Sequence, residues 1–303
     1  MAVNKVIVDG VTEIDLTADT VTAETLAEGK TAHNSKGEAI TGTMTGGGGS
    51  DEWEAQMANL IMGNAITQLP SGLKKIGDYK FYNCEDLALT SLPEGIEEIG
   101  KYAFYGCKKF NATSLPSSLK KIYERAFEYC DQFKKNLSSL PSGLTYIGGY
   151  VFYGFTNLAL TSLPSDITEI ANYAFANCTN LALTSLPLGL SEISNNVFDG
   201  CTNLNLTAIP DNITYIRWRA FYDCTNLALT SLPAAITKID GYAFKGCTGL
   251  TTLTFRGTPN TIAATIFDGC SNLKDIYVPW SKGTVANAPW GATNATIHYD
   301  SEV

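Results

Sequence analysis

Residues 178–198 read CTNLALTSLPLGLSEISNNVF, and close variants of this stretch follow one another along most of the chain. Phenylalanine returns at every twenty-third position, except that the step from Phe127 to Phe152 is longer by two. Its positions are Phe81, Phe104, Phe127, Phe152, Phe175, Phe198, Phe221, Phe244 and Phe267. Proline and cysteine keep the same period, and Phe155 stands in the one place where a cysteine is missing. A fixed period in this range predicts a leucine-rich solenoid.

Each unit contains the parts of one coil of such a solenoid. Pro187 follows a first extended stretch, and because it lacks an N–H it ends strand pairing at little cost. The second stretch runs into a short helical turn, SNNVFDGC, which would place Phe198 and Cys201 on one face. The inward side chains of the two stretches are Leu181, Leu183, Leu186, Leu190 and Ile193. Since one coil cannot bury its apolar face alone, we predict an α/β solenoid of about nine stacked coils.

The repeated words IGDYKFYNC and IGKYAFYGC, with LTSLP between them, resemble the BspA-like leucine-rich repeat family over about residues 66–278. The early units read NLALTSLP and depart from the commoner family spacing of strand residues, to which the last two units return. A two-residue insertion within residues 133–137 explains the one longer step of the period. The resemblance implies a leucine-rich repeat solenoid and, as one role, adhesion to host matrix proteins or to other cells.

The two ends of the chain follow other patterns. Residues 1–44 predict a small β-rich attachment module, and residues 45–50, with the sequence TGGGGS, predict a flexible linker. An apolar stripe predicts a helix over residues 51–65 that caps the first coil, with association between subunits as the alternative role. Residues 279–303 break the repeat and are expected to cap its other end. The solenoid itself is predicted to occupy residues 66–278.

Within residues 1–44, we expect a turn at Asp9-Gly10 and a hairpin around Asn34 to Gly37. The words TVTAETLAEGKTAHNSKGEAITGTM resemble a small module found near the starts of tail and host-recognition proteins of bacteriophages. This resemblance covers about one-seventh of the chain. It implies that this part of the chain attaches the protein to a virion.

The cysteines recur once per coil, so no two of them are closer in the sequence than one full repeat. Zinc sites instead take pairs of ligands about two to five residues apart. Thiols stacked on adjacent coils would be close enough for a disulfide. A packed row of parallel side chains nevertheless favours small buried thiols, and Phe155 replaces one cysteine without any change in its neighbours. We therefore expect free, buried cysteines and no metal.

The composition and the residue types exclude several classes of function. The chain carries 21 Lys and Arg against 30 Asp and Glu, a net charge of −9, which argues against binding nucleic acid through its phosphates. No run of apolar residues is long enough for membrane insertion. His33 and His298 stand near opposite ends of the sequence, so we expect neither to serve as a base for a nucleophile. Adjacent acids such as Glu97-Glu98 are expected to be solvated. We predict a protein without enzymatic activity, cofactor or metal.

Lysine pairs cluster in the first half of the repeats. We expect them to lie on a solvated face, and the alternative is a docking patch for an anionic polymer. The pairs are Lys74-Lys75, Lys108-Lys109, Lys120-Lys121 and Lys134-Lys135.

Tyrosine and arginine recur two places before the phenylalanine, where stacking of the coils would bring them together. Exposed Tyr and Arg are enriched in recognition surfaces, and tyrosine faces suit sugar rings. Alternatively, these side chains only stack on one another and shield the core. A second file contains Tyr82, Tyr105, Tyr153 and Tyr222. The candidate binding residues are Tyr79, Tyr102, Arg125, Tyr150, Tyr173, Trp218, Arg219 and Tyr242.

We therefore predict a phage tail or baseplate-associated receptor-binding protein without enzymatic activity. Its solenoid would bind a bacterial surface glycan or protein, and residues 1–44 would bind other virion proteins. The alternatives are a bacterial cell-surface adhesin of the BspA-like kind and a purely structural fibre or decoration protein of the virion. A virion protein would be assembled in the host cytoplasm, where free thiols persist. A homo-oligomer would associate through residues 1–44 or through the helix at 51–64.

Overall fold

The chain divides into two units, residues 1–64 and 65–303, and each is described here by itself. A computed structural model describes four strands of the first unit and, in the second, residues 68–69 and 71–302. In the first unit β1 (Lys5–Val8) lies between β2 (Thr12–Asp15) and β3 (Thr31–His33), and β3 pairs with β4 (Ala39–Thr41). All three pairings are antiparallel, as expected for a turn at residues 9–10 and a hairpin around 34–37. The linker and the helix predicted for residues 45–65 lie outside the described residues.

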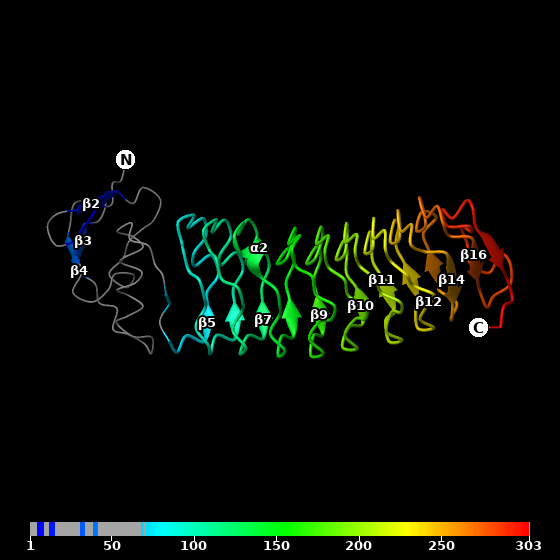
Figure 1. The fold of residues 1–303 in the computed structure, drawn as a ribbon, viewed down its shortest axis with the longest axis horizontal. Helices are drawn as coiled ribbons and strands as arrows, with labels where there is room; N and C mark the ends of the chain where they lie inside the picture. Colours follow the sequence, from blue (N-terminus) through cyan, green and yellow to red (C-terminus); the bar gives the residue numbers. More distant parts are fainter. Residues whose placement is uncertain are drawn as a thin grey trace. The chain divides into compact units, whose positions relative to one another are not determined.

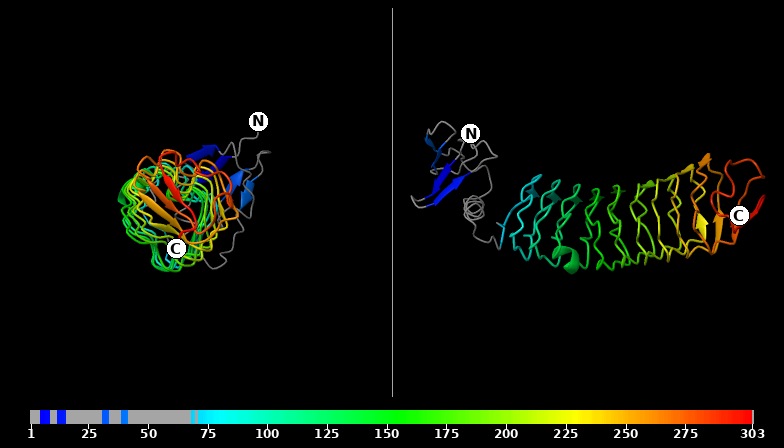
Figure 2. Two further views of the ribbon diagram at one scale, coloured as in Figure 1. Left: turned by 90° about the vertical axis from the view of Figure 1, so that its right-hand side faces the viewer. Right: turned by 90° about the horizontal axis from the view of Figure 1, so that it is seen from above.

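The second unit is a solenoid with a 23-residue period and about ten turns, which confirms the predicted fold. Figure 1 shows its coils side by side in chain order, and the end-on view in Figure 2 shows that they wind around a common axis. One side of each coil is a strand of two residues. Parallel pairing joins β5 (Lys75–Ile76), β6 (Glu98–Ile99), β7 (Lys121–Ile122), β8 (Tyr146–Ile147) and β9 (Glu169–Ile170), and separately β10 (Glu192–Ile193), β11 (Tyr215–Ile216), β13 (Lys238–Ile239) and β15 (Thr261–Ile262).

Within residues 71–302, the other extended stretch forms a sheet only at the C-terminal end. There, β12 (Ser231–Leu232), β14 (Thr252–Phe255), β16 (Asp275–Tyr277) and β17 (Thr296–His298) pair in parallel. Earlier coils, which read NLALTSLP, share only isolated backbone bonds on this side, such as Ala182 N to Leu160 O at 2.9 Å. The departure from the commoner spacing of strand residues therefore corresponds to a real loss of strand structure.

The helical turn expected before each cysteine is replaced by single hydrogen-bonded turns. The amides of Tyr79 and Phe81 donate to carbonyls of the next coil, those of Lys101 and Ala103, at 2.8 and 2.7 Å. Because these N–H groups bond between coils, they are not available for bonds along a helix. Among the described residues, the α-helical segment is α2 (Phe133–Asn136), which occupies the predicted insertion.

Phenylalanine rings stack along the core. The Phe81 and Phe104 centroids lie 5.2 Å apart, and those of Phe221 and Phe244 lie 5.3 Å apart. Next to the insertion, Phe133 of α2 packs in the same core, with its ring 4.6 Å from Phe127 and 5.6 Å from Phe155. Phe133 stands three residues after Cys130, as Phe110 stands three residues after Cys107, so it fills the ordinary inward position of its coil and the two inserted residues follow it.

The cysteines are free, and all of them except the half-buried Cys84 are buried, as predicted. Each buried thiol donates a hydrogen bond to the carbonyl of a phenylalanine in the preceding coil, as Cys201 Sγ does to Phe175 O at 3.0 Å. Burial raises the pKa of Cys178 and of Cys270 to about 12. Since the thiolate is the reactive form, these cysteines are core side chains rather than nucleophiles.

At the C-terminal end, two tryptophans cover the last phenylalanine side chains. Trp290 is fully buried and Trp280 nearly so, and their rings lie 5.8 and 5.4 Å from that of Phe255. Strand β17 also continues the parallel sheet beyond β16. These contacts support our interpretation of residues 279–303 as a cap.

The sheet on the two-residue side is interrupted between β9 and β10, and we call this boundary the open seam. At the next boundary, Thr214 N donates to Ser191 O at 3.0 Å and Arg217 N to Ile193 O at 2.9 Å. Across the open seam, the amides of Ser191 and Ser194 make no corresponding bonds among the described residues. The Ser194 hydroxyl instead donates to Ile170 O at 2.5 Å. One side-chain bond thus replaces two backbone bonds.

We expect the amides of Ser191 and Ser194 to exchange with deuterium at least about tenfold faster than those of Thr214 and Arg217, because they lack a hydrogen-bond acceptor. Residue-resolved hydrogen exchange by NMR measures this difference. Replacing Ser194 by Gly, the residue at positions 100 and 148 of closed boundaries, is expected to slow the exchange of Ser191. Equal protection on both sides of β10 would contradict the open seam.

Candidate functional site

Five of the eight predicted binding residues form one continuous stack. The rings of Tyr79 and Tyr102 are parallel at 4.9 Å, and those of Tyr150 and Tyr173 at 4.6 Å. The Arg125 guanidinium lies between the two pairs, 6.0 Å from the Tyr102 ring and 4.0 Å from the Tyr150 ring. Tyr79 is exposed, and the other four are half-buried. The predicted stacking is therefore present, and it covers most of the ring faces.

The predicted ladder is not continuous along the solenoid. Asn196 takes the next position, is buried, and donates from Nδ2 to Asp199 Oδ2 at 2.7 Å. Beyond it, Arg219 lies over the Tyr222 ring at 3.7 Å, and the exposed Trp218 meets Tyr242 edge to face at 6.4 Å. Trp218, Arg219 and Tyr242 thus form a second cluster, because the short side chain of Asn196 does not bridge Tyr173 and Arg219.

The backbone at this ladder position is left-handed. All eight residues from Tyr79 to Tyr242, including Asn196, have φ between 52° and 61°. This conformation costs an L-residue about 1–2 kcal/mol, and asparagine and glycine tolerate it best. Asn196 shows that asparagine fits here. The backbone therefore does not account for tyrosine or arginine at the other seven positions, and their side chains must provide the reason.

One exposed tyrosine was missed in the sequence. Tyr129 has φ of 60° and stands in a file otherwise occupied by Asn, Asp or Gly, such as Asn83 and Gly106. Its ring meets Tyr105 edge to face at 5.2 Å, and Tyr105 stacks on Tyr82 at 5.0 Å. The signal in the sequence was a bulky residue at a Gly/Asn position.

Tyr79, Tyr82 and Tyr129 are 55%, 43% and 51% exposed. Together with Tyr102 and Tyr105, they form what we call the tyrosine surface. Its rings contact one another, since Tyr79 and Tyr82 lie 5.7 Å apart and Tyr102 and Tyr105 lie 5.6 Å apart. It offers ring edges and phenol hydroxyls, a combination suited to sugars and to protein surfaces.

A buried carboxylate holds Arg125 beside this surface. Glu128, with only 4% of its surface exposed, accepts a hydrogen bond from Arg125 Nη1 at 2.7 Å. The bond and the charge of Glu128 raise the pKa of Arg125 against the effect of its partial burial. The Arg125 cation is therefore neutralised locally, whereas Lys134 Nζ, 5.6 Å from the centre of the Tyr129 ring, places a positive charge beside the tyrosine surface.

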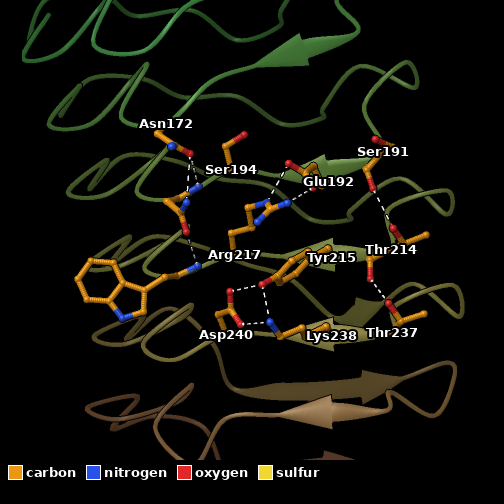
Figure 3. A network of polar contacts seen from close by, with 12 residues as sticks. Asn172, Ser191, Glu192, Ser194, Thr214, Tyr215, Arg217, Thr237, Lys238 and Asp240 are labelled. Atoms are coloured by element: carbon orange, nitrogen blue, oxygen red, sulfur yellow. Dashed lines mark hydrogen bonds and ion pairs between the residues drawn. The ribbon is translucent and has the colours of Figure 1, made fainter.

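The strand face carries a polar network that the sequence did not reveal (Figure 3). Arg217 makes two hydrogen bonds to Glu192, at 2.8 and 2.7 Å. The Tyr215 hydroxyl donates to Asp240 at 2.5 Å and accepts from Lys238 at 2.7 Å. Because these charged groups pair with one another, the network joins coils and leaves little charge for a ligand.

The early lysines pair with acids of neighbouring coils. Glu97 lies between Lys74 and Lys120, 3.8 and 2.7 Å away, and Lys108 pairs with Glu85 at 2.8 Å. The hydrogen bond from Lys120 lowers the pKa of Glu97. These pairings favour the solvated face over a docking patch for an anionic polymer.

Elsewhere, the remaining histidine of the described residues makes contacts within the fold. His298 Nε2 lies 2.8 Å from Asp275 Oδ1, and its ring stacks on Tyr277 at 4.4 Å. Within the described part of the chain, no group of three or more His, Cys, Asp or Glu side chains is placed to hold a metal ion. No helix there has the length and apolar character needed to cross a bilayer.

Comparison with known proteins gives a repeat family and a similar solved fold. A model of the BspA type leucine-rich repeat region, in six copies, matches residues 64–182 and 180–289. A leucine-rich repeat protein from Bacteroides ovatus is 26% identical with a TM-score of 0.51, over 75% of this chain and 64% of that protein. A leucine-rich repeat protein of T. pallidum is 29% identical with a TM-score of 0.43, over 54% of this chain and 77% of that one.

No curated protein matches the chain. The chain spans 64% of the length of the Bacteroides ovatus protein. The family match begins at residue 64, so the resemblance of residues 1–44 to a phage module stays a prediction. The match covers well over half of the sequence and includes the stacked phenylalanines and the tyrosine surface. The chain belongs to the BspA type leucine-rich repeat family.

Proposed function

We propose that this chain is a cell-surface adhesin of the BspA-like kind, which binds a protein or glycan on another cell or in a matrix through its tyrosine surface. The proposal rests on the exposure and the backbone position of Tyr129. A bulky, exposed side chain occupies a left-handed backbone position where most other coils have Asn or Gly. Since this choice costs stability, contact with a partner is its simplest benefit.

The proposal includes no chemical step. Arg125, beside the tyrosine surface, is paired with Glu128, and burial raises the pKa of thiols such as that of Cys178. Binding would be reversible, and many copies on one cell would raise the overall avidity well above that of one weak site. Family membership supports this role.

Receptor binding by a phage tail protein is the second candidate. It is favoured by the wording of residues 20–44 and by the antiparallel strands that this region contributes. Immunogold labelling of cells and of purified phage particles separates the two locations. Label found only on phage particles would contradict the adhesin and favour a receptor-binding protein or a structural fibre of the virion.

Binding of the labelled full chain to intact bacteria and to a panel of extracellular matrix proteins tests the proposal. A double variant with Tyr79→Asn and Tyr129→Asn removes both rings and introduces asparagine, which tolerates the left-handed backbone. We expect it to bind at least about tenfold more weakly, with an unchanged melting temperature. Tyr242→Asn, in the second cluster, is the matched control and should bind normally.

Two outcomes would overturn the proposal. Loss of binding in the Tyr242→Asn variant alone would assign recognition to the cluster of Trp218, Arg219 and Tyr242. Saturable binding to none of the cells or matrix proteins would leave a structural role for the solenoid.

A further inference from the structure

A different side of the coils contains a shallow hollow of about 540 Å³. It is lined by Ala182, Asn203, Asn205, Thr225, Asn226 and Gly249. None of these six residues is charged, and none is aromatic. Three of them carry a carboxamide, which both donates and accepts hydrogen bonds.

Asn205 has no ladder partner. In the early coils, Asn111 and Asn136 occupy the equivalent position on adjacent coils, and Asn136 Nδ2 donates to Asn111 Oδ1. Asn205 instead stands between Ala182 and Ala228. Among the described residues, its carboxamide has no hydrogen-bond partner, so both its N–H and its C=O groups are available in the hollow.

The neighbouring asparagine ladder also ends in the hollow. Asn203 Nδ2 donates to Asn180 Oδ1 and Asn226 Nδ2 to Asn203 Oδ1, both at 3.3 Å. The next coil has Gly249, so Asn226 Oδ1 accepts nothing from the described residues. A Cβ on Gly249 would lie 2.6 Å from Leu227 O, which explains the glycine and the space beside it.

We propose that this hollow binds an uncharged glycan. Neighbouring sugar hydroxyls donate and accept together, and so complement the free carboxamide of Asn205 and the free Asn226 oxygen. Anionic polymers would need a cation, and no lysine or arginine lines the hollow. Peptides dock on sheet edges or in apolar grooves, and neither is present among its lining residues. This site is separate from the tyrosine surface and does not depend on it.

Titration of the isotopically labelled full chain, followed through its side-chain amide signals in NMR spectra, tests the proposal. The neutral probes are maltotetraose, cellotetraose, mannotetraose and chitotetraose, and the charged probe is tetragalacturonate. We expect at least one neutral probe to shift the side-chain amide signals of Asn203, Asn205 and Asn226 saturably. We expect no such shift with tetragalacturonate.

The chain offers matched variants. Asn205→Ala restores the residue that other coils carry, at positions 159, 182 and 228, so it should fold and should weaken binding about tenfold, as the signals of Asn203 and Asn226 report. Ala228→Asn would give Asn205 the partner that Asn136 gives Asn111, and should also weaken binding. Asn157→Ala lies outside the hollow and should leave binding unchanged.

Three results would overturn the proposal. They are the absence of any shift at these asparagines at the solubility limit of the neutral probes, a shift with tetragalacturonate alone, and binding that Asn205→Ala leaves intact. Because the tyrosine surface remains unaltered in these variants, failure here leaves the adhesin proposal open to its own test.

Discussion

Replacing Phe133 by Ala is expected to lower the free energy of unfolding by about 4 kcal/mol. The side chain is fully buried, and its ring contacts Phe110 at 5.0 Å, Phe127 at 4.6 Å and Phe155 at 5.6 Å. Its removal would leave a cavity among the Phe110, Phe127 and Phe155 rings, because the surrounding core relaxes only in part. Urea denaturation followed by circular dichroism measures the loss.

Lys135→Ala is the control for this experiment. It lies exposed on the same helix and should change stability by less than about 0.5 kcal/mol. Phe155→Cys, which restores the residue found in other coils, should also destabilise here. Since the two rings touch, the effects of Phe133→Ala and Phe155→Cys should not add. A loss below about 1 kcal/mol for Phe133→Ala would contradict its role as a core side chain.

Replacing Glu128 by Ala is expected to cost about 3 kcal/mol, also measured by urea denaturation. Glu128 is 4% exposed and holds the Arg125 guanidinium between Tyr102 and Tyr150. Without it, the half-buried cation keeps only the more exposed Glu124, whose Oε1 lies 3.6 Å from Arg125 Nε, and the desolvation of the charge is offset much less. The cost is at the low end for buried pairs, because Arg125 keeps 28% of its side chain exposed.

The neighbouring coils provide the compensating change. They carry Tyr at both equivalent positions, as Tyr102 with Tyr105 and Tyr150 with Tyr153. The double variant Arg125→Tyr and Glu128→Tyr should therefore recover most of the stability lost in Glu128→Ala and continue the tyrosine stack. If the double variant is as unstable as Glu128→Ala, the loss does not arise from the arginine that has lost its buried partner.

Much of the fold could be predicted because its period is visible in single residues. The two-residue insertion was located from one irregular step, and the buried cysteines followed from their regular spacing. The early NLALTSLP stretches looked like strands because their apolar residues alternate. Whether these stretches form a sheet depends on the number of backbone hydrogen bonds between adjacent coils. The sequence of a single repeat does not determine that number.

The candidate site could be predicted only in part. The files of Tyr79 and Tyr82 were visible because their members share one frame. Tyr129 belongs to another frame, and only the left-handed backbone and the edge contact with Tyr105 show that it completes the tyrosine surface. Asn205 resembles other asparagines of the repeats until its alanine neighbours on adjacent coils are known.

The sequence by itself determined the repeat, the inward residues of each coil and the place of the insertion, because burial of apolar side chains at a constant period admits one kind of solenoid. Only the tertiary structure decided which outward side chains meet. Contacts such as Arg125 with Tyr150, or the open seam beside Ser194, join residues that belong to different coils. They depend on the spacing and backbone conformation of whole coils, which no single unit specifies.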